Sequence, residues 1–134
     1  MPLMMRGPGI PAGENVIRVT VNADLAPTIL DLANATPGLP MDGRSLIPLA
    51  RNPELERRRG VLIEEPTFKA IRTERYLYAE YSSGERELYD LKNDPYELQS
   101  RDMAPAYARV RSRLAARLQK LQSCAGASCR AHPR

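Results

Sequence analysis

The stretch GVLIEEPTFKAIRTERYLYAEYSSGERELYDL, residues 60–91, contains four short segments with the two-residue alternation typical of β-strands. Aromatic and β-branched residues are frequent in these segments, as expected for a pleated, half-buried surface. The links between the segments are short and rich in turn-forming residues, so successive strands are antiparallel neighbours. We therefore expect a four-stranded antiparallel meander with strands at residues 61–64, 68–73, 76–81 and 87–91.

An amphipathic helix is predicted after these strands. Pro105 suits the first position of a helix, and apolar residues then recur every three or four positions while basic residues occupy the other faces. The apolar positions are Tyr107, Val110, Leu114, Leu118 and Leu121. Such a stripe must be covered, and the sheet is the obvious partner. The expected fold class is thus α+β, a four-stranded antiparallel sheet packed by a C-terminal amphipathic helix.

The chain before residue 60 has helical and loop patterns instead. Residues 2–5 are compatible with a very short strand, and the Gly- and Pro-rich residues 6–13 indicate a loop. Asp24 is a candidate N-cap for a helix over residues 25–33, which carries apolar residues at helical spacing. Ser45 is a candidate cap for one further short helical turn.

The net charge of +4 is unevenly distributed. Residues 101–134 hold eight of the 20 basic residues but only one of the 16 acidic ones. This asymmetry indicates either a contact with nucleic acid or membrane, or a solvated helix face followed by a loose tail. Nucleic-acid binding is not expected, because the basic helix has no aromatic stacking platform and no helix-turn-helix partner. No apolar run approaches the ~18 residues of a membrane-spanning helix, and no targeting signal is recognised.

Few residues of the chain are candidates for chemistry. Cys124 and Cys129 are separated by four residues, which is compatible with a local disulfide, with two free thiols, or with a zinc site that His132 would complete to three ligands at most. We favour the disulfide. His132 is the only histidine and lies near the C-terminus, where nothing holds it against a nucleophile. We therefore assign no catalytic, cofactor-binding or metal-binding residue.

Four segments together resemble one family, the sulfatases. They are Pro2–Gly9 (PLMMRGPG), Val21–Ala33 (VNADLAPTILDLA), Met41–Leu49 (MDGRSLIPL) and Glu87–Glu97 (ELYDLKNDPYE). They are similar to the family's VPLxxRGPG, DLAPTLLDLAG, DGxSLxPLL and ELYDLxxDPxE segments, in the same order and spacing. The resemblance runs over roughly residues 2–130. Asn34 departs from it, because the family often has Gly there, and Gln99-Ser100 stands where Asn-Leu is common.

The resemblance implies an alkaline-phosphatase-like enzyme with an α/β core that hydrolyses sulfate esters, such as an arylsulfatase. Its nucleophile would be a formylglycine made from a C/S-x-P-x-R motif, and its cation, usually Ca²⁺, would stabilise developing oxyanion charge. This chain has no such motif, since Pro48 follows Ser45 one position too late. The family's metal-binding and catalytic segments precede its VPLxxRGPG segment. We therefore expect Ca²⁺ and formylglycine in the full-length enzyme and neither in this chain.

The expected organisation follows from that resemblance. Residues 1–50 are the C-terminal edge of the α/β sulfatase core, as a strand-loop-helix remnant. Residues 51–123 are the antiparallel C-terminal subdomain with its helix, and residues 124–134 are a tail with the candidate disulfide. The chain is expected to be an inactive scaffold fragment whose partner is the N-terminal catalytic portion, in a secreted or periplasmic protein. The alternatives are a fragment of a related phosphodiesterase or phosphonate hydrolase, and a stand-alone polyanion-binding module.

Overall fold

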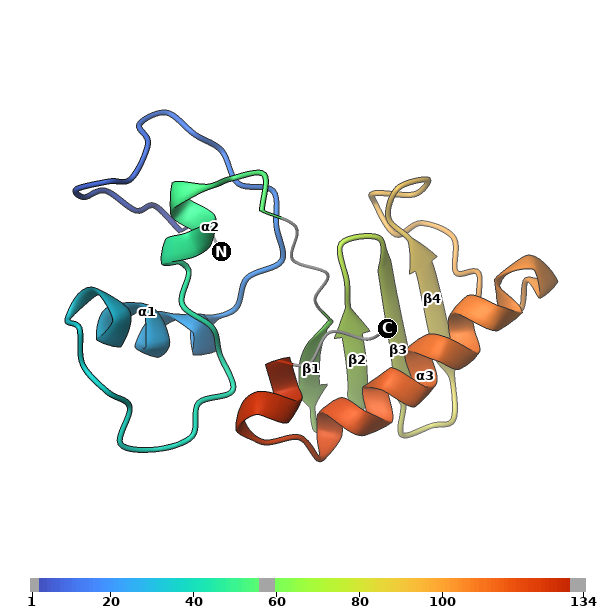
Figure 1. Ribbon diagram of the computed structural model, residues 1–134. Coiled ribbons are helices and arrows are strands. Elements are labelled where there is room, and N and C mark those ends of the chain that lie inside the picture. The colour runs from blue at the N-terminus through green and yellow to red at the C-terminus, as the bar shows by residue number, and fades with distance from the viewer. Residues whose placement is uncertain (1–2, 56–59, 131–134) are drawn as a thin grey trace. The chain divides into compact units, whose positions relative to one another are not determined.

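The computed structural model describes residues 3–55 and 60–130. Helices and strands follow one another as η1 (Asn22–Asp24), α1 (Leu25–Leu32), α2 (Ile47–Arg51), β1 (Val61–Glu65), β2 (Phe68–Arg72), β3 (Tyr76–Tyr81), β4 (Arg86–Asp90), η2 (Pro105–Tyr107), α3 (Ala108–Gln122) and η3 (Gly126–Arg130), where η denotes a 3₁₀ helix (Figure 1). These elements form two compact units. The first contains the described parts of residues 1–57 and 125–131, and the second contains residues 60–124.

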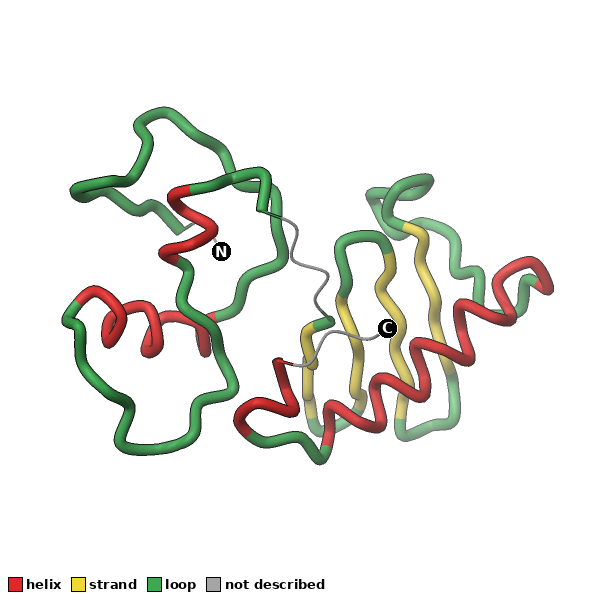
Figure 2. Tube along the Cα trace, in the orientation of Figure 1, coloured by secondary structure: helices red, strands yellow, loops and turns green. Residues whose placement is uncertain are grey.

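The second unit is built on a four-stranded antiparallel sheet with strand order β1-β2-β3-β4 (Figure 2). The order confirms the predicted meander, and each strand boundary lies within one or two residues of the expectation. Ile71 of β2 lies opposite Tyr78 of β3, which in turn lies opposite Leu88 of β4. Because side chains alternate across a strand, this register places the three side chains on the same face of the sheet.

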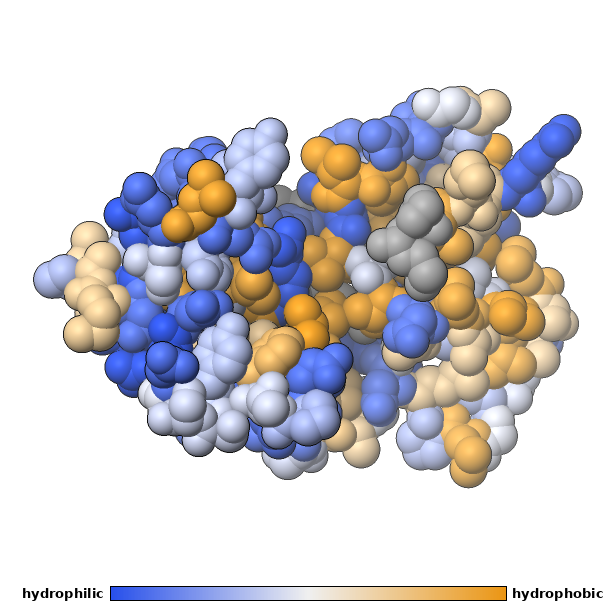
Figure 3. Space-filling model, turned by 180° about the vertical axis from the view of Figure 1, so that it is seen from behind, coloured by the Kyte–Doolittle hydropathy of each residue, from blue (hydrophilic) through white to orange (hydrophobic). Residues whose placement is uncertain are grey.

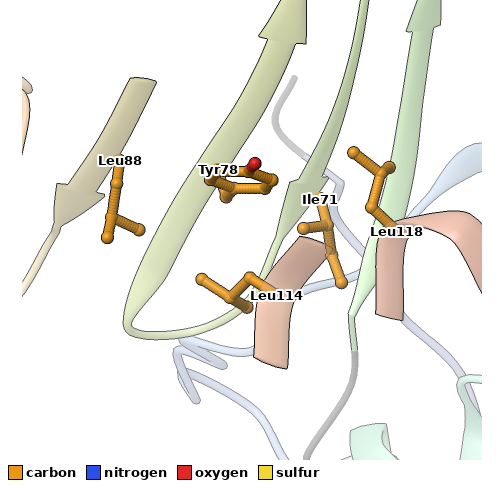
Figure 4. Close-up of a cluster of buried hydrophobic side chains, with 5 residues drawn as sticks. All are labelled: Ile71, Tyr78, Leu88, Leu114 and Leu118. Carbon is orange, nitrogen blue, oxygen red and sulfur yellow. The ribbon is translucent and has the colours of Figure 1, made fainter. Parts of the chain in front are cut away.

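The helix α3 crosses this face of the sheet and forms the core of the unit (Figure 1). Leu114 and Leu118 of α3 pack against Ile71, Tyr78 and Leu88 of the sheet, and none of the five is more than 2% exposed (Figure 4). Partly buried residues surround them, including Tyr107, Val110 and Leu121. The apolar stripe read from the sequence is therefore the stripe that the helix buries. The α+β fold class is confirmed.

The first unit has few buried apolar residues. Leu46, Ile47 and Leu49, in and next to α2, are at most 5% exposed. In α1, by contrast, Ile29 is 65% exposed and Leu32 is 63% exposed, and Thr28 is the buried residue. No described helix is long and apolar enough to cross a membrane.

Three expectations for the chain outside the sheet are corrected by the structure. Of the short strand expected over residues 2–5, the described residues 3–5 form no strand, and no described segment pairs with them. Asp24 makes no side-chain cap to α1; it closes the preceding turn η1 by accepting from the Val21 N–H at 3.1 Å. The C-terminal segment, for which the sequence analysis offered a loose tail, contains η3, which begins at Gly126 with a backbone φ of 57°.

Candidate functional site

The carboxylate of Asp90, the last residue of β4, accepts hydrogen bonds from three side chains. Arg75 donates from Nε to Oδ1 at 3.1 Å and from Nη2 to Oδ2 at 3.0 Å. The amide nitrogen of Asn93 and the hydroxyl of Tyr107 donate to Oδ2 at 2.9 and 3.1 Å. The Arg75 guanidinium also lies 4.9 Å from the centre of the Tyr76 ring. The ELYDLKNDPYE segment is thereby joined to the β2–β3 turn and to η2.

The sequence places Asp90 where this network is required. Asp90 lies opposite Tyr76 on the face that α3 covers, and it is 1% exposed. A buried carboxylate is costly unless it is paired and hydrogen-bonded, and a guanidinium matches it with two parallel bonds. The hydrogen bonds from Arg75 hold the pKa of Asp90 below its usual value, and the same contact raises the pKa of Arg75. Asp90 is therefore held ionised as a structural anchor.

The loop after β4 folds back along the edge of that strand. The carboxylate of Asp94 accepts from the backbone N–H groups of Leu98 and Gln99 at 3.1 and 2.8 Å. The N–H of Arg101 donates to the carbonyl of Leu88 at 2.7 Å, and the N–H of Leu88 donates to the hydroxyl oxygen of Ser100 at 3.2 Å. A sheet edge that is bonded in this way is not available for pairing with another chain. Ser100 and Arg101 thus cover the edge of β4 at Leu88, and Asp94 fixes the turn that leads to them.

The first unit has a similar anchor at Asp24, which is fully buried. Its Oδ1 accepts from the backbone N–H of Arg44 at 2.8 Å, so the carboxylate ties the DGRS turn to the start of α1. The Thr28 hydroxyl donates to the Asp24 carbonyl at 2.5 Å and accepts from the N–H of Leu46 at 2.9 Å. The Ser45 hydroxyl donates to Asp31 at 2.5 Å and accepts from the Ile47 N–H at 3.2 Å. It lies one residue before the N-cap of α2, which is Leu46, so the cap expected at Ser45 is corrected by one position.

Asp42, in the same turn, holds the C-terminal segment. Its Oδ1 accepts from the N–H of Gly126 at 2.6 Å, and Arg130 donates to the carbonyl of Gly43 at 3.4 Å. Beside this contact lies a hollow of about 380 Å³, lined chiefly by Pro27 and residues 37–41 together with Arg130. Its lining offers one cation and no carboxylate. Three of the four family-like segments, Val21–Ala33, Met41–Leu49 and Glu87–Glu97, therefore fix turns through their buried or hydrogen-bonded carboxylates.

The potential metal ligands of the described residues are dispersed. Among residues 3–55 and 60–130, no three His, Cys, Asp or Glu side chains lie close enough together to hold a metal ion. A hard cation such as Ca²⁺ takes six to eight oxygen ligands, so the described residues do not fit the cation of the sulfatase centre. A second charged cluster joins Asp102, which is 5% exposed, to Arg86 of β4 at 3.4 Å and to Arg111 of α3 at 3.9 Å.

Two of the three residues considered as ligands or thiols in the sequence analysis lie in the described part of the chain. Cys124 follows α3 and Cys129 lies in η3, and neither is a free thiol. Their pairing under cellular redox conditions stays a prediction. His132 lies outside the described residues. Sequence reasoning missed the role of Asp90, although one signal was present: an acidic residue on the inward-facing side of a strand, at the helix-covered face, requires a cationic partner.

The chain is similar to several known proteins. The family model for the C-terminal region of N-sulphoglucosamine sulphohydrolase matches residues 1–124. The sulfatase ppz1 of Metarhizium majus is 32% identical over 139 residues, covering 97% of this chain and 31% of the relative. A solved 2-O GAG sulfatase superposes with a TM-score of 0.69 at 26% identity, covering 95% of this chain and 33% of its own.

A structure with a different chemistry is also similar. The phosphonate monoester hydrolase of Agrobacterium radiobacter superposes with a TM-score of 0.64 at 28% identity, covering 79% of this chain and 25% of its own. The chain thus spans between a quarter and a third of the length of these three proteins. Because the family model matches nearly the whole chain, this protein belongs to the sulfatase family and corresponds to the C-terminal portion of a sulfatase.

Proposed function

We propose that this chain is the structural C-terminal portion of a sulfuric ester hydrolase and that it does not hydrolyse sulfate esters by itself. The observation that carries the proposal is the match over residues 1–124 to a C-terminal sulfatase model, in a chain that spans about a third of its relatives. A formylglycine nucleophile and Ca²⁺ would then be supplied by an N-terminal catalytic portion. The carboxylates described above support this division, because they stabilise turns and strand edges.

The contribution of this chain to such an enzyme would be positional. Asp90 and Asp94 shape the loop after β4, and Asp24 shapes the turn at residues 42–45. Rigid turns of this kind hold neighbouring chain segments within the narrow tolerance that a catalytic site needs. We therefore expect mutations here to change the stability of the whole enzyme and the placement of its substrate, without removing a reacting group.

The test uses an aryl sulfate such as 4-nitrophenyl sulfate. The isolated chain is expected to release nitrophenol no faster than buffer with added Ca²⁺. A chimera in which this chain replaces the C-terminal third of the Metarhizium sulfatase is expected to retain turnover, with the intact Metarhizium enzyme as the positive control. Turnover by the isolated chain above the buffer rate refutes the scaffold role. A folded chimera without turnover refutes the assignment to a sulfatase.

A phosphonate or phosphodiester hydrolase is the second candidate, and the likeness to the Agrobacterium enzyme favours it. The two candidates differ in which catalytic portion this chain supports. A second chimera joins it to the N-terminal portion of the Agrobacterium hydrolase, and each chimera is compared with its own parent by kcat/KM. Better retention in the sulfatase chimera supports the first candidate, and better retention in the hydrolase chimera supports the second.

A stand-alone polyanion-binding module is the third candidate, and the charge of α3 is the observation behind it. The helix carries five cations and no carboxylate. Arg111 donates to the backbone of Asp102, and Arg117 is only partly exposed next to Gly60, so three cations remain on the outer side: Arg109, Arg113 and Lys120. Retention on heparin resin that falls steeply with salt would support this candidate, and elution in low salt would exclude it.

We further propose that the parent protein is exported, because a disulfide between Cys124 and Cys129 suits an oxidising compartment. The entropy model gives such a short loop about 2 kcal/mol of stabilisation. Protein secreted by an expression host is expected to show no thiol reactive to Ellman's reagent in denaturant until a reductant is added. Two reactive thiols in the secreted, unreduced protein would contradict the proposal.

A further inference from the structure

The side of α3 that is turned away from the sheet carries a row of cations. At about 100° per residue, Arg109, Arg113 and Lys120 lie within about 40° of one another around the helix axis, on the side away from the buried Leu114 and Leu118. All three cations are exposed, and we call them the basic row. A rise of about 1.5 Å per residue makes the row roughly 16 Å long. Figure 1 shows α3 lying across the front of the sheet, so this side of the helix faces the viewer.

The basic row has no carboxylate partner among residues 3–55 and 60–130, and α3 itself contains no acidic residue. Cations elsewhere in the second unit are paired, as Arg75 is with Asp90 at 3.0 Å. The side of the molecule away from α3, seen in Figure 3, mixes hydrophobic and hydrophilic side chains. On that face of the sheet, by the strand register, lies Arg72, which pairs with Glu97 at 3.0 Å. The basic row is therefore a concentration of positive charge that the described chain leaves without a counter-charge.

Arg117 lies beside the basic row and adds to its charge. Arg109, Arg113 and Arg117 follow one another at intervals of four residues, and like charges at this spacing destabilise a helix. Arg117 is half-buried against Gly60, where a Cβ would lie 2.7 Å from the guanidinium carbon. Burial lowers the pKa of the Arg117 guanidinium, and the charge of Arg113 lowers it further. An anion bound across the two guanidinium groups would reduce both the cost of burial and the repulsion.

The residues around the basic row favour a sulfated polysaccharide over other anionic partners. A helix that binds a membrane surface needs an exposed apolar face, and the apolar face of α3 is buried in the core. Single-stranded nucleic acid is bound through aromatic side chains on which its bases stack, but the exposed residues beside the cations are Ser112, Ala116 and Gln119. The hydroxyl of Ser112 and the amide of Gln119 can form hydrogen bonds with sugar hydroxyls, and guanidinium groups bind tetrahedral oxyanions with two parallel hydrogen bonds.

We propose that the basic row, with Arg117 beside it, binds a sulfated polysaccharide and holds a polymeric substrate on the enzyme through sulfates other than the one that is cleaved. The inference rests on the proposed function, because the substrate of a sulfuric ester hydrolase carries sulfate and a polymer presents that group repeatedly. Cations four residues apart on a helix have Cβ atoms about 5–6 Å apart, so a single sulfate reaches two of them at most, whereas an extended chain can engage the whole row. Several weak contacts on one chain add up to useful affinity.

Binding of the full chain to fluorescein-labelled heparin, measured by anisotropy at several salt concentrations, tests the site. Arg109→Gln/Arg113→Gln removes two cations of the basic row, and Arg51→Gln/Lys92→Gln removes two exposed cations outside it, so both variants have the same net charge. The first variant is expected to bind roughly ten-fold more weakly, with a slope of log K against log salt that is shallower by about 1.5. The second is expected to bind nearly as the wild type does. Equal losses in the two variants, or a wild-type chain that does not bind at low salt, would overturn the proposal.

Three competing probes identify the class of ligand: chemically desulfated heparin, single-stranded DNA with the same number of charges, and phosphatidylserine vesicles. Each is expected to displace labelled heparin at least several-fold less well than unlabelled heparin does. Equal or better competition by any of them would overturn the assignment to a sulfated polysaccharide. Arg109→Lys/Arg113→Lys keeps both charges and is expected to retain most of the affinity that Arg109→Gln/Arg113→Gln loses, and a loss as large in the lysine variant would contradict the electrostatic basis of the site.

Turnover of 4-nitrophenyl sulfate by the Metarhizium chimera is measured in parallel, so that the site and the proposed function are tested separately. Turnover by the chimera together with heparin binding that is insensitive to the basic row would overturn the site alone. Binding that depends on the basic row, in a chain whose folded chimera has no turnover, would refute the role in a sulfatase and support the stand-alone polyanion-binding module.

Discussion

Asp90 and Arg75 form an ion pair whose two side chains differ in exposure, 2% for the carboxylate and 52% for the guanidinium. Replacing the carboxylate by an amide in Asp90→Asn keeps the shape and removes the charge. Because Arg75 remains solvated, the cost is that of charge-assisted hydrogen bonds, about 2 kcal/mol, and not the larger cost of isolating a buried ion. The free energy of unfolding in urea measures this cost. Glu85→Gln, at an exposed hairpin position, is the control, and an equal midpoint for both variants would contradict the anchoring role.

The same carboxyl predicts a pH dependence. The Arg75 hydrogen bonds lower the pKa of Asp90 in the folded chain, so its contribution to stability is fully present above the unfolded pKa of about 3.9. The contribution is lost as the pH falls through the lower, folded value. We expect the difference in unfolding free energy between wild type and Asp90→Asn to shrink below about pH 4 and to stay constant above pH 5. A difference that grows on acidification would contradict this assignment.

Position 43 requires glycine because the backbone of residues 23–24 passes too close to leave room for a side chain. A Cβ at this position would overlap the carbonyl group of Ala23 and lie 2.9 Å from the Asp24 nitrogen, so the two segments joined by Asp24 must separate. We expect Gly43→Ala to destabilise the first unit by roughly 1–3 kcal/mol. Gly38→Ala is a matched control, because a Cβ at Gly38 meets nothing within 4 Å. Similar melting curves for the two variants would contradict the steric argument.

Among the elements, α3 is the one whose removal from the sheet would expose the core. Leu118 is 0% exposed and packs on Ile71, so Leu118→Ala leaves a cavity and is expected to cost about 2–5 kcal/mol. The neighbouring Gln119 is exposed, and Gln119→Ala is expected to change the unfolding free energy by less than about 0.5 kcal/mol. Guanidinium unfolding followed by circular dichroism compares them, and a small effect of Leu118→Ala would show that the helix is held elsewhere.

The strands and α3 could be predicted from the sequence because each is marked by a local pattern of apolar residues, and those apolar residues are the ones that the fold buries. The alternation in residues 61–91 follows the sheet, and the spacing from Tyr107 to Leu121 follows the buried stripe. Contacts between distant residues could not be predicted in this way. The bonds from Asp24 to Arg44 and from Asp42 to Gly126 join positions 20 and 84 residues apart, and no periodicity reports them. The N-cap expected at Asp24 was wrong, because one carboxylate oxygen accepts from Val21 in the preceding turn and the other from the distant Arg44.

At the scale of the whole chain, the difference in burial between the two units predicts that the first unfolds locally at a lower free-energy cost than the second. In the second unit the sheet and α3 share a core in which Ile71, Leu88 and Leu118 are completely buried. In the first unit α1 leaves Ile29 and Leu32 mostly exposed, so few apolar contacts oppose its local unfolding. We expect amide hydrogens of residues 1–50 to exchange faster than those of residues 60–121, with the slowest amides in β2, β3 and α3.

Hydrogen exchange monitored by mass spectrometry at neutral pH can compare the isolated chain with the chimera. If the exposed side of α1 is a surface that the catalytic portion covers, protection of residues 25–32 should rise in the chimera, while β2 and β3 change little because they are already near the global limit. In the isolated chain, cooling or added salt should not produce the same rise in protection at residues 25–32. Equal protection of both units in the isolated chain would instead show that residues 1–50 have a core of their own, and the hydrophobic exposure of Ile29 and Leu32 would then need another explanation.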